Sequence, residues 1–280
     1  MNALSPLGDD PQPESSDNSD QNVTDWVDYI VAYFVAIQRY TRISFVPLDA
    51  DRKETIEKRS TRLLVLAGFS LGLLLTILLA LAQFIWPLEI AVLLVGSIEL
   101  LFLRTFVPES IPQCREILTS RRPTTSSGNI FVLTILFMLL RMALFYQLLS
   151  ESITLLTPCL LILISISLGA WMIPFCISIA ESHDETARWI NPDRPLSKKQ
   201  LCYGSLIFIP LFLWGSWASL NILAPALVAT ALLMYWIMRK LEDHDTEVTD
   251  THIEGLACLS QIVFLLVCTI DFSFLRKLSE

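Results

Sequence analysis

The stretch RLLVLAGFSLGLLLTILLALAQFI, residues 62–85, decides the fold class of this chain. It has no charged residue after Arg62, and a helix of about 20 apolar residues is long enough to cross the roughly 30 Å hydrocarbon core of a bilayer. Trp86-Pro87 follows, and the residue before a proline is disfavoured in a helix. The stretch therefore predicts a membrane-spanning helix that ends near residue 85.

The rest of the chain repeats this pattern. Of its 280 residues, 53% are hydrophobic and only 17% are charged, which is more apolar than soluble domains are. The fifth and sixth apolar stretches are almost continuous. The region of Asn221 and Pro225 and the length of the whole run favour a turn between them, and whether the two spans are separate stays open. The predicted fold class is all-α, a polytopic integral membrane helical bundle of about seven transmembrane helices. The predicted spans are 62–85, 88–106, 129–149, 153–180, 201–219, 222–240 and 256–273.

Two segments precede the first span. Residues 1–22 are rich in Pro, Ser, Asp and Asn and poor in apolar groups, which predicts a disordered acidic tail. Residues 23–60 mix apolar and charged residues, which predicts an interfacial amphipathic helix followed by a basic loop. Residues 61–275 are then the transmembrane helical domain. Four aromatic residues are expected at headgroup level: Trp26, Tyr29, Tyr33 and Tyr40.

The distribution of Lys and Arg predicts the orientation. Seven precede the first span, four lie between the second and third, four lie between the fourth and fifth, and Arg239 and Lys240 follow the sixth. The intervening connections contain none, and cation-rich loops stay in the cytoplasm. We therefore expect the N-terminus and the loops 107–128, 181–200 and 239–255 to be cytoplasmic. The last two cations, Arg276 and Lys277, are the exception.

Arg141 lies near the middle of the third predicted span, where a charge costs at least about 2.5–3.5 kcal/mol. We expect it to face the bundle and to have a partner. One interpretation is a contact with the phosphate of an anionic substrate. The other is a structural ion pair with Glu99 or Asp271, and the sequence leaves both open.

Two acidic segments are candidates for a metal site. The loop 241–254 combines His244 and His252 with several carboxylates, and oxygen ligands at this density suit Mg²⁺ held together with substrate phosphates. A solvated acidic loop is the alternative interpretation; it is favoured for both segments, and more strongly for the shorter one, 181–185. The carboxylates of the first loop are Glu242, Asp243, Asp245, Glu247, Asp250 and Glu254.

Other features of the sequence predict packing rather than chemistry. The six cysteines show no paired spacing and are expected to be small buried hydrophobes. Gly68 and Gly72 are expected to let a neighbouring helix approach closely. The chain has no cationic stripe with interleaved aromatics, which argues against binding to nucleic acid.

The segment YFVAIQRYTR, residues 33–42, followed by Val46-Pro47, resembles the start of the cobalamin synthase family, the adenosylcobinamide-GDP ribazoletransferases. In that family a pattern like F-F-x-A-L-Q-F-L-T-R precedes Val-Pro. Further similar segments follow in the family's order, spread over residues 30–270. They are Glu116–Arg121 with Gly128, Arg141 at the place of an embedded lysine, Ala187-Arg188, Arg239–Leu241, Thr249–Thr251 and Val263–Leu266.

The chain departs from the family where an acidic motif, D-G-x-A-D-x-x-D-G, is expected. The corresponding segment, 101–112, contains Glu109 as its only acid. Glu242 and Asp243 replace two glycines that precede the family's last aspartate, and Leu168 stands where an arginine is expected. These departures bear directly on the magnesium site that the resemblance implies.

The resemblance implies a multi-pass enzyme of cobalamin biosynthesis in the cytoplasmic (inner) membrane of a bacterium. It would join adenosylcobinamide-GDP and α-ribazole 5′-phosphate to adenosylcobalamin 5′-phosphate, release GMP and use Mg²⁺. Its implied partners are the lipid bilayer, corrinoid and nucleotide-linked substrates, and other membrane proteins of the pathway. The implied site residues are Asp250 and Glu109 for catalysis, Arg141, Arg121 and Arg42 for substrate phosphate, and Asp243, Asp245, Glu247 and Asp250 for the metal.

Two other functions stay open. A non-catalytic membrane relative of the family would keep the fold and bind a corrinoid or a pathway enzyme. A transporter would need polar residues along a path through the bundle, and apart from Arg141 the predicted spans contain few charges.

Overall fold

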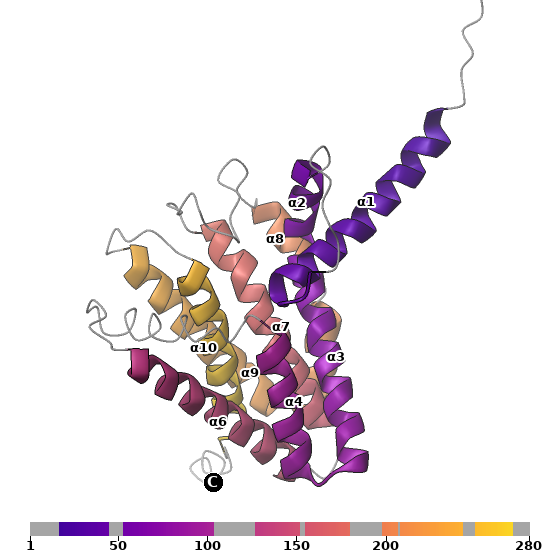
Figure 1. The fold of residues 1–280 in the computed structure, drawn as a ribbon. Helices are drawn as coiled ribbons and strands as arrows, with labels where there is room; N and C mark the ends of the chain where they lie inside the picture. Colours follow the sequence, from indigo (N-terminus) through magenta and orange to yellow (C-terminus); the bar gives the residue numbers. More distant parts are fainter. Residues whose placement is uncertain are drawn as a thin grey trace, which may run out of the picture.

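A computed structural model describes residues 17–44, 53–103, 127–151, 155–179, 198–206, 208–242 and 250–270. In this part of the chain the regular elements are α-helices, together with one isolated β-bridge. The all-α fold class is therefore confirmed for these residues. The helices are α1 (Asp17–Tyr40), α2 (Lys53–Arg62), α3 (Leu64–Ile85), α4 (Leu88–Phe102), α6 (Ser127–Glu151), α7 (Leu156–Ile179), α8 (Lys198–Ser205), α9 (Phe208–Glu242) and α10 (Asp250–Cys268) (Figure 1).

Three helical stretches are long and apolar enough to cross a membrane: Leu64–Ile85 in α3, Leu156–Ser178 in α7 and Ile222–Lys240 in α9. Two shorter apolar stretches, Ile135–Ser150 and His252–Cys268, coincide with the third and seventh predicted spans. The transmembrane helical character of the chain therefore rests on three helices, while the number of seven crossings stays a prediction.

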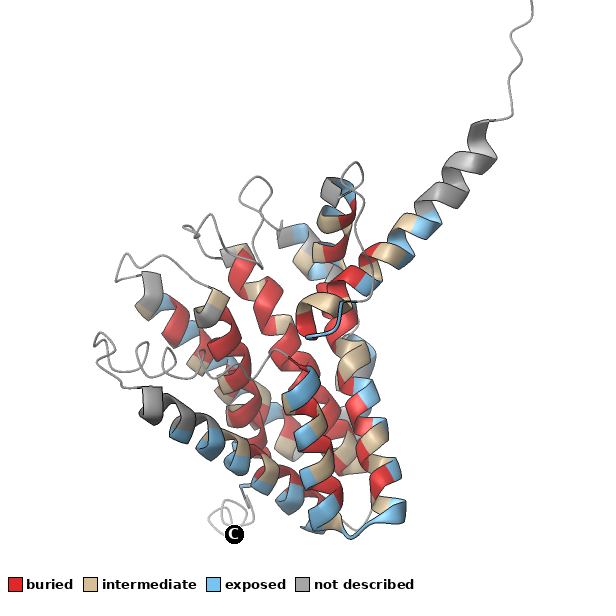
Figure 2. Ribbon diagram, viewed as in Figure 1, coloured by how far each residue is buried: buried red, intermediate tan, exposed pale blue. Residues whose placement is uncertain are grey.

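The central helix of the bundle is α7. It packs against α3, α9 and α10, and 83% of its most apolar window is buried, compared with 44% for α3 and 33% for the stretch in α9. A helix that is apolar on all sides lies either among other helices or in lipid, and α7 lies largely among other helices. Figure 2 shows the buried residues concentrated in α7 and in the facing sides of α3 and α10.

Gly68 and Gly72 let α3 lie close to α7. A Cβ at Gly68 would collide with the Cβ of Ala170, and a Cβ at Gly72 would lie 3.2 Å from both Ile166 Cγ2 and Ser167 Oγ. The predicted role of these glycines in helix packing is confirmed. Close approach through small residues is a principal means of association between apolar helices in lipid.

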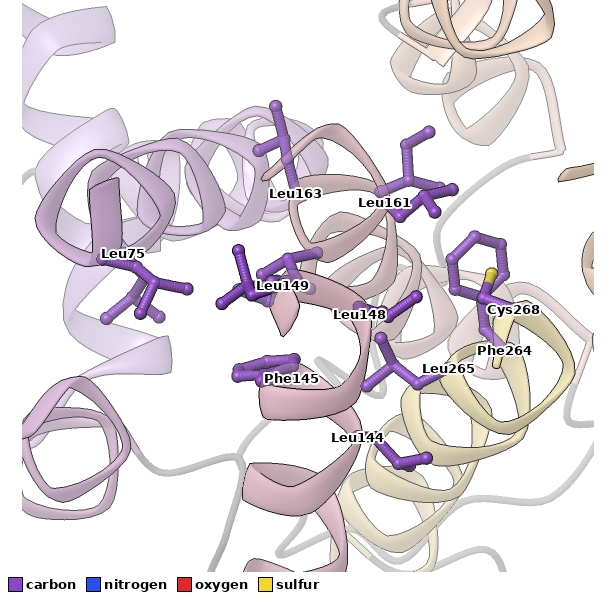
Figure 3. Close-up of a cluster of buried hydrophobic side chains, with 14 of the residues drawn as sticks. Leu75, Leu144, Phe145, Leu148, Leu149, Leu161, Leu163, Phe264, Leu265 and Cys268 are labelled. Carbon is purple, nitrogen blue, oxygen red and sulfur yellow. The ribbon is translucent and has the colours of Figure 1, made fainter. Parts of the chain in front are cut away.

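The turn after α3 follows from Pro87. Trp86 is extended, as expected for a residue before proline, and α4 starts directly after Pro87. The helix α6 packs against α4, α7 and α10, and its carboxyl-terminal half contributes to a shared buried cluster (Figure 3). Its residues there include Leu144, Phe145 and Leu148, which pack near Leu75 of α3 and Leu265 of α10.

The amino-terminal elements differ from the prediction at two boundaries. α1 begins at Asp17, before the predicted start at Val23, so the expected limit of the acidic tail falls inside the helix. Part of the predicted basic loop is the helix α2, whose Ile56 is buried against Ala32 and Val35 of α1. A short helix with mostly polar residues is stabilised by such tertiary contacts rather than by its own propensity.

The path of α9 corrects the predicted turn near Asn221. The chain stays helical from Phe208 to Glu242, with Pro225 inside the helix, so the predicted break in helical structure is wrong. In a straight helix, Phe212 and Met234 would lie about 33 Å apart. Both nevertheless line one cavity of about 430 Å³ with α7 residues. α9 is therefore strongly bent, with a first arm that contains Phe212 and a second arm at Ile222–Lys240.

Candidate functional site at the end of α4

The end of α1 and the end of α4 are joined by backbone pairing. Thr41 and Leu103 form an antiparallel β-bridge, and the backbone N–H of Arg42 donates to the carbonyl of Phe102 at 2.9 Å. The side chain of Arg42 is exposed beside this bridge. Arg42, a predicted phosphate contact, is thereby fixed next to the start of the segment that contains Glu109.

Tyr40 anchors the same end of α1 in the bundle. Its side chain is 1% exposed, and its hydroxyl donates to the carbonyl of Ala170 at 2.9 Å. In an α-helix this carbonyl would accept from residue 174, but Pro174 has no N–H. Burial raises the pKa of the Tyr40 hydroxyl above its usual value, with Arg39 opposing this more weakly, so the hydroxyl keeps its proton.

Arg141 of α6 forms a buried ion pair with Glu99 of α4. Its Nη1 atom lies 2.6 Å from Glu99 Oε1, and the two side chains are only 4% and 5% exposed. The guanidinium also lies over the ring of Phe145, 5.0 Å from its centroid. Of the two interpretations of Arg141, the structural ion pair with Glu99 is present, and the phosphate contact stays a proposal.

The ion pair lies just below the bridge between α1 and α4. The N–H of Leu103 donates to the carbonyl of Glu99 at 2.8 Å, so one helical turn separates the bridge from the carboxylate. The exposed Arg42 therefore lies beside the end of α4, and the ion pair between Glu99 and Arg141 lies one helical turn further into the bundle. Chemically, Arg42 can bind an anion there, while Glu99 and Arg141 fix the position of α4 against α6.

The predicted acidic ligands are placed only in part. Asp250 is the first residue of α10 and is half-buried, His252 is half-buried, and Glu254 is buried. The predicted loop 239–255 is thus helical at both ends, because α9 continues to Glu242 and α10 begins at Asp250. The remaining predicted residues, Glu109, Arg121, Asp243, Asp245 and Glu247, and the segment 181–185 lie outside the described residues.

Magnesium was tested against the residues that are described. Among them, no group of three or more His, Cys, Asp or Glu residues lies close enough together to hold a metal ion. The described donors alone therefore do not fit the implied ion, and no chemical step is derived through it.

Sequence reasoning missed two parts of this region. The bridge between Thr41 and Leu103 joins residues far apart in the chain, and no local signal predicts it. The link between Tyr40 and Ala170 had one signal, because an internal proline such as Pro174 always leaves a carbonyl without its helical donor. Leu168, which replaces an expected arginine, is buried in α7 and lines the apolar cavity between α7 and α9.

Comparisons of the chain with family models, with curated proteins and with solved structures found no match.

Proposed function

We propose that this protein is a divergent membrane-embedded transferase of the cobalamin synthase type with seven transmembrane spans. It joins adenosylcobinamide-GDP to α-ribazole 5′-phosphate and releases GMP at the cytoplasmic face of a bacterial inner membrane. In this reaction a ribose hydroxyl attacks the phosphorus atom of the cobinamide phosphate. The bond from this phosphorus to the GMP oxygen breaks, and the hydroxyl proton leaves.

One observation carries the proposal. The segment 33–42, which resembles the start of the family, is paired through Thr41 with Leu103, which lies in the segment 101–112 that corresponds to the family's acidic motif. Two segments that are distant in sequence and that the family comparison singles out are therefore adjacent in space. Arg42 lies exposed at their junction, where a diphosphate-linked substrate needs a cation.

The proposal assigns separate tasks to the arginines. Arg42 binds the substrate phosphate at the end of α4, together with Arg121 by resemblance. Arg141 holds α6 against α4 through Glu99, so that the bridge and Arg42 keep a fixed position. By resemblance, Asp250, Asp243, Asp245 and Glu247 bind Mg²⁺, and Asp250 and Glu109 are catalytic.

A second candidate, the non-catalytic relative, is favoured by the pairing of Arg141 with Glu99. A guanidinium that is engaged by a carboxylate and 4% exposed is poorly placed to reach a substrate phosphate. In this alternative, the end of α4 binds a corrinoid or a pathway enzyme without catalysing the transfer. Within the described residues, no observation favours the transporter.

Complementation of a bacterium that lacks its own cobalamin synthase tests the proposal. We expect the wild-type chain to restore cobalamin-dependent growth, and Asp250→Ala and Glu109→Ala to abolish it. Arg42→Ala should slow transfer in isolated membranes by about tenfold or more, equivalent to about 1.4 kcal/mol. Lys58→Ala is the matched control, because Lys58 is an exposed cation on α2.

The outcomes separate the candidates. Absence of rescue despite normal abundance in the membrane would rule out the transferase and leave the non-catalytic relative. Equal loss of activity in Arg42→Ala and Lys58→Ala would show that surface charge in general, and not the position at the end of α4, is what matters. Solute flux in proteoliposomes would support the transporter.

A further inference from the structure

A cavity of about 430 Å³ lies between α7, α8 and the two arms of α9. α7 contributes Trp171 and Phe175, whose rings stack with their centroids 4.8 Å apart. Phe212 lines it from the first arm of α9, and Leu227 and Met234 line it from the second. Cavities of this size are typical of ligand sites, which range over about 300–1,000 Å³.

The few polar groups of the cavity wall are engaged within the protein. Trp171 Nε1 donates to Ser205 Oγ at 2.7 Å, and the Ser205 hydroxyl donates to the carbonyl of Leu201 at 2.7 Å. The Thr230 hydroxyl donates to the carbonyl of Ala226, also at 2.7 Å. The wall therefore offers almost only carbon atoms to a ligand. Such a cavity disfavours water and polar nucleotides and accepts an apolar chain.

Two residues of the second arm of α9 that line the cavity, Ala231 and Tyr235, are exposed, and we take them as its entrance. The walls formed by α7 and by the second arm belong to two of the three stretches that can cross a membrane. The opening therefore faces the hydrocarbon region of the bilayer. From Tyr235 to Leu227 it extends along α9 for about 12 Å, parallel to the helix that crosses the lipid.

Two cations lie one turn beyond the rim. Arg239 Nη1 donates to the Tyr235 hydroxyl at 3.3 Å, which connects the first cation to a residue that lines the cavity. Lys240 Nζ lies 4.8 Å from the centroid of the Trp236 ring. Tyr, Trp, Arg and Lys together are typical of the level of the lipid phosphates. A single lipid can therefore meet the apolar cavity and these cations at once.

We propose that this cavity binds one acyl chain of an anionic phospholipid whose phosphate group lies at Arg239 and Lys240. The acyl chain of the lipid enters past Ala231 and Tyr235 and contacts Trp171 and Phe175 at the inner wall of the cavity. This site lies between α7 and α9, away from the bridge that joins α1 and α4. The proposal does not depend on the transferase activity.

Photocrosslinking of the full-length protein in nanodiscs tests this proposal. The probe is phosphatidylglycerol with a diazirine on one acyl chain, and the labelled peptides are identified by mass spectrometry. We expect label on α7 near Trp171 and Phe175 and on the second arm of α9. Ala231→Trp should fill the entrance and lower this label about tenfold. Leu232→Trp, at the next and equally exposed position outside the cavity, should leave it unchanged.

The proposed contact of Arg239 and Lys240 with the lipid phosphate is tested by competition between an anionic and a zwitterionic lipid. Arg239→Gln combined with Lys240→Gln should remove the preference for phosphatidylglycerol over phosphatidylcholine while label in the cavity persists. Label spread evenly over the outer helix faces, or equal label in Ala231→Trp and Leu232→Trp, would overturn the site.

Discussion

The ion pair between Arg141 and Glu99 determines how α4 and α6 are held together. Two charges removed from water carry a desolvation cost that their attraction offsets only when the geometry is good. Here the two atoms are 2.6 Å apart, and Phe145 covers the guanidinium. The pair therefore contributes specificity to the helix contact more than net stability, since apolar residues of similar size would pack there at similar free energy.

Breaking this pair on one side should be costly. We expect Glu99→Gln to lower the free energy of unfolding by about 3–5 kcal/mol, because the buried guanidinium of Arg141 loses the carboxylate that lies 2.6 Å from it. The double variant Glu99→Met with Arg141→Met should lie within about 1 kcal/mol of the wild type. Denaturant unfolding in detergent measures both. A double variant that is less stable than Glu99→Gln would contradict the structural role of the pair.

The hydroxyl of Tyr40 donates the hydrogen bond to Ala170 that the backbone of Pro174 cannot supply. Because Pro174 cannot donate, the Ala170 carbonyl depends on Tyr40 for its hydrogen bond inside the bundle. A buried carbonyl without a donor costs about 1–3 kcal/mol. The Tyr40 side chain of α1 thus replaces the backbone hydrogen bond that Pro174 removes from α7.

A double-mutant cycle tests this compensation. Tyr40→Phe should destabilise the wild type by about 1–3 kcal/mol and should cost clearly less in a Pro174→Ala background. In that background, residue 174 can donate to the Ala170 carbonyl. Thermal unfolding in one detergent gives the four values, with Tyr29→Phe at an exposed position as control. Equal costs in both backgrounds would show that the two sites are independent.

At the scale of the helix, α9 shows how a proline acts in an apolar stretch. Pro225 leaves the carbonyl of Asn221 without its helical donor and weakens the helix in the region where the two arms diverge. In lipid a helix does not unravel there, because unpaired backbone groups are too costly. The result is a strong bend rather than a loop.

Distances between spin labels can verify the bend. Labels at Ile209 and Leu232, both exposed, would lie about 35 Å apart in a straight helix. Because both arms of α9 line one cavity, we expect a distance clearly shorter than this. Pulsed electron resonance on a cysteine-free background carrying these two cysteines gives the distance. A value near that of a straight helix would show that α9 is not bent.

The sequence predicted the elements best where composition alone determines them. α3, α6 and α7 lie within a few residues of their predicted spans, since a long uncharged stretch has few alternatives in lipid. α2 was missed because its ten residues are mostly polar and their helix depends on contacts with α1. The continuity of α9 was missed because a proline predicts either a kink or an end, and tertiary packing selects between them.

At the scale of the whole molecule, two cation-rich segments within the described residues, α2 and α8, lie in contact. α2, which begins at Lys53 and ends at Arg62, contacts α8, which begins with Lys198 and Lys199 (Figure 1). The uncharged turn at Trp86-Pro87 lies at the far end of α3. Which side of the membrane the end with α2 and α8 faces stays a prediction from the distribution of cations.

Cysteine accessibility tests this orientation. In a cysteine-free background, Lys58→Cys and Lys199→Cys should react with a membrane-impermeant maleimide only after the cells are opened. Trp86→Cys should react in intact cells. All three positions are exposed, so differences in reactivity report the side of the membrane. Labelling of Lys58→Cys and Lys199→Cys from opposite sides would contradict the predicted cytoplasmic face.

The candidate site was less predictable than the fold. The sequence identified Arg42, Arg141 and Glu99 as residues of interest, and it named Glu99 among the possible partners of Arg141. It could not predict that Thr41 pairs with Leu103, because this contact depends on the relative placement of α1 and α4. The lipid-facing cavity was also missed, since it exists only when both arms of α9 pack around α7.

The ion pair also sets an order for biogenesis. Glu99 is synthesised 42 residues before Arg141, so α4 leaves the ribosome well ahead of its partner. If α6 moved alone from the insertion channel into lipid, the charged guanidinium of Arg141 would enter hydrocarbon without Glu99, which is costly. We therefore expect α6 to enter an apolar environment together with α4, because the Glu99 carboxylate then neutralises the Arg141 guanidinium.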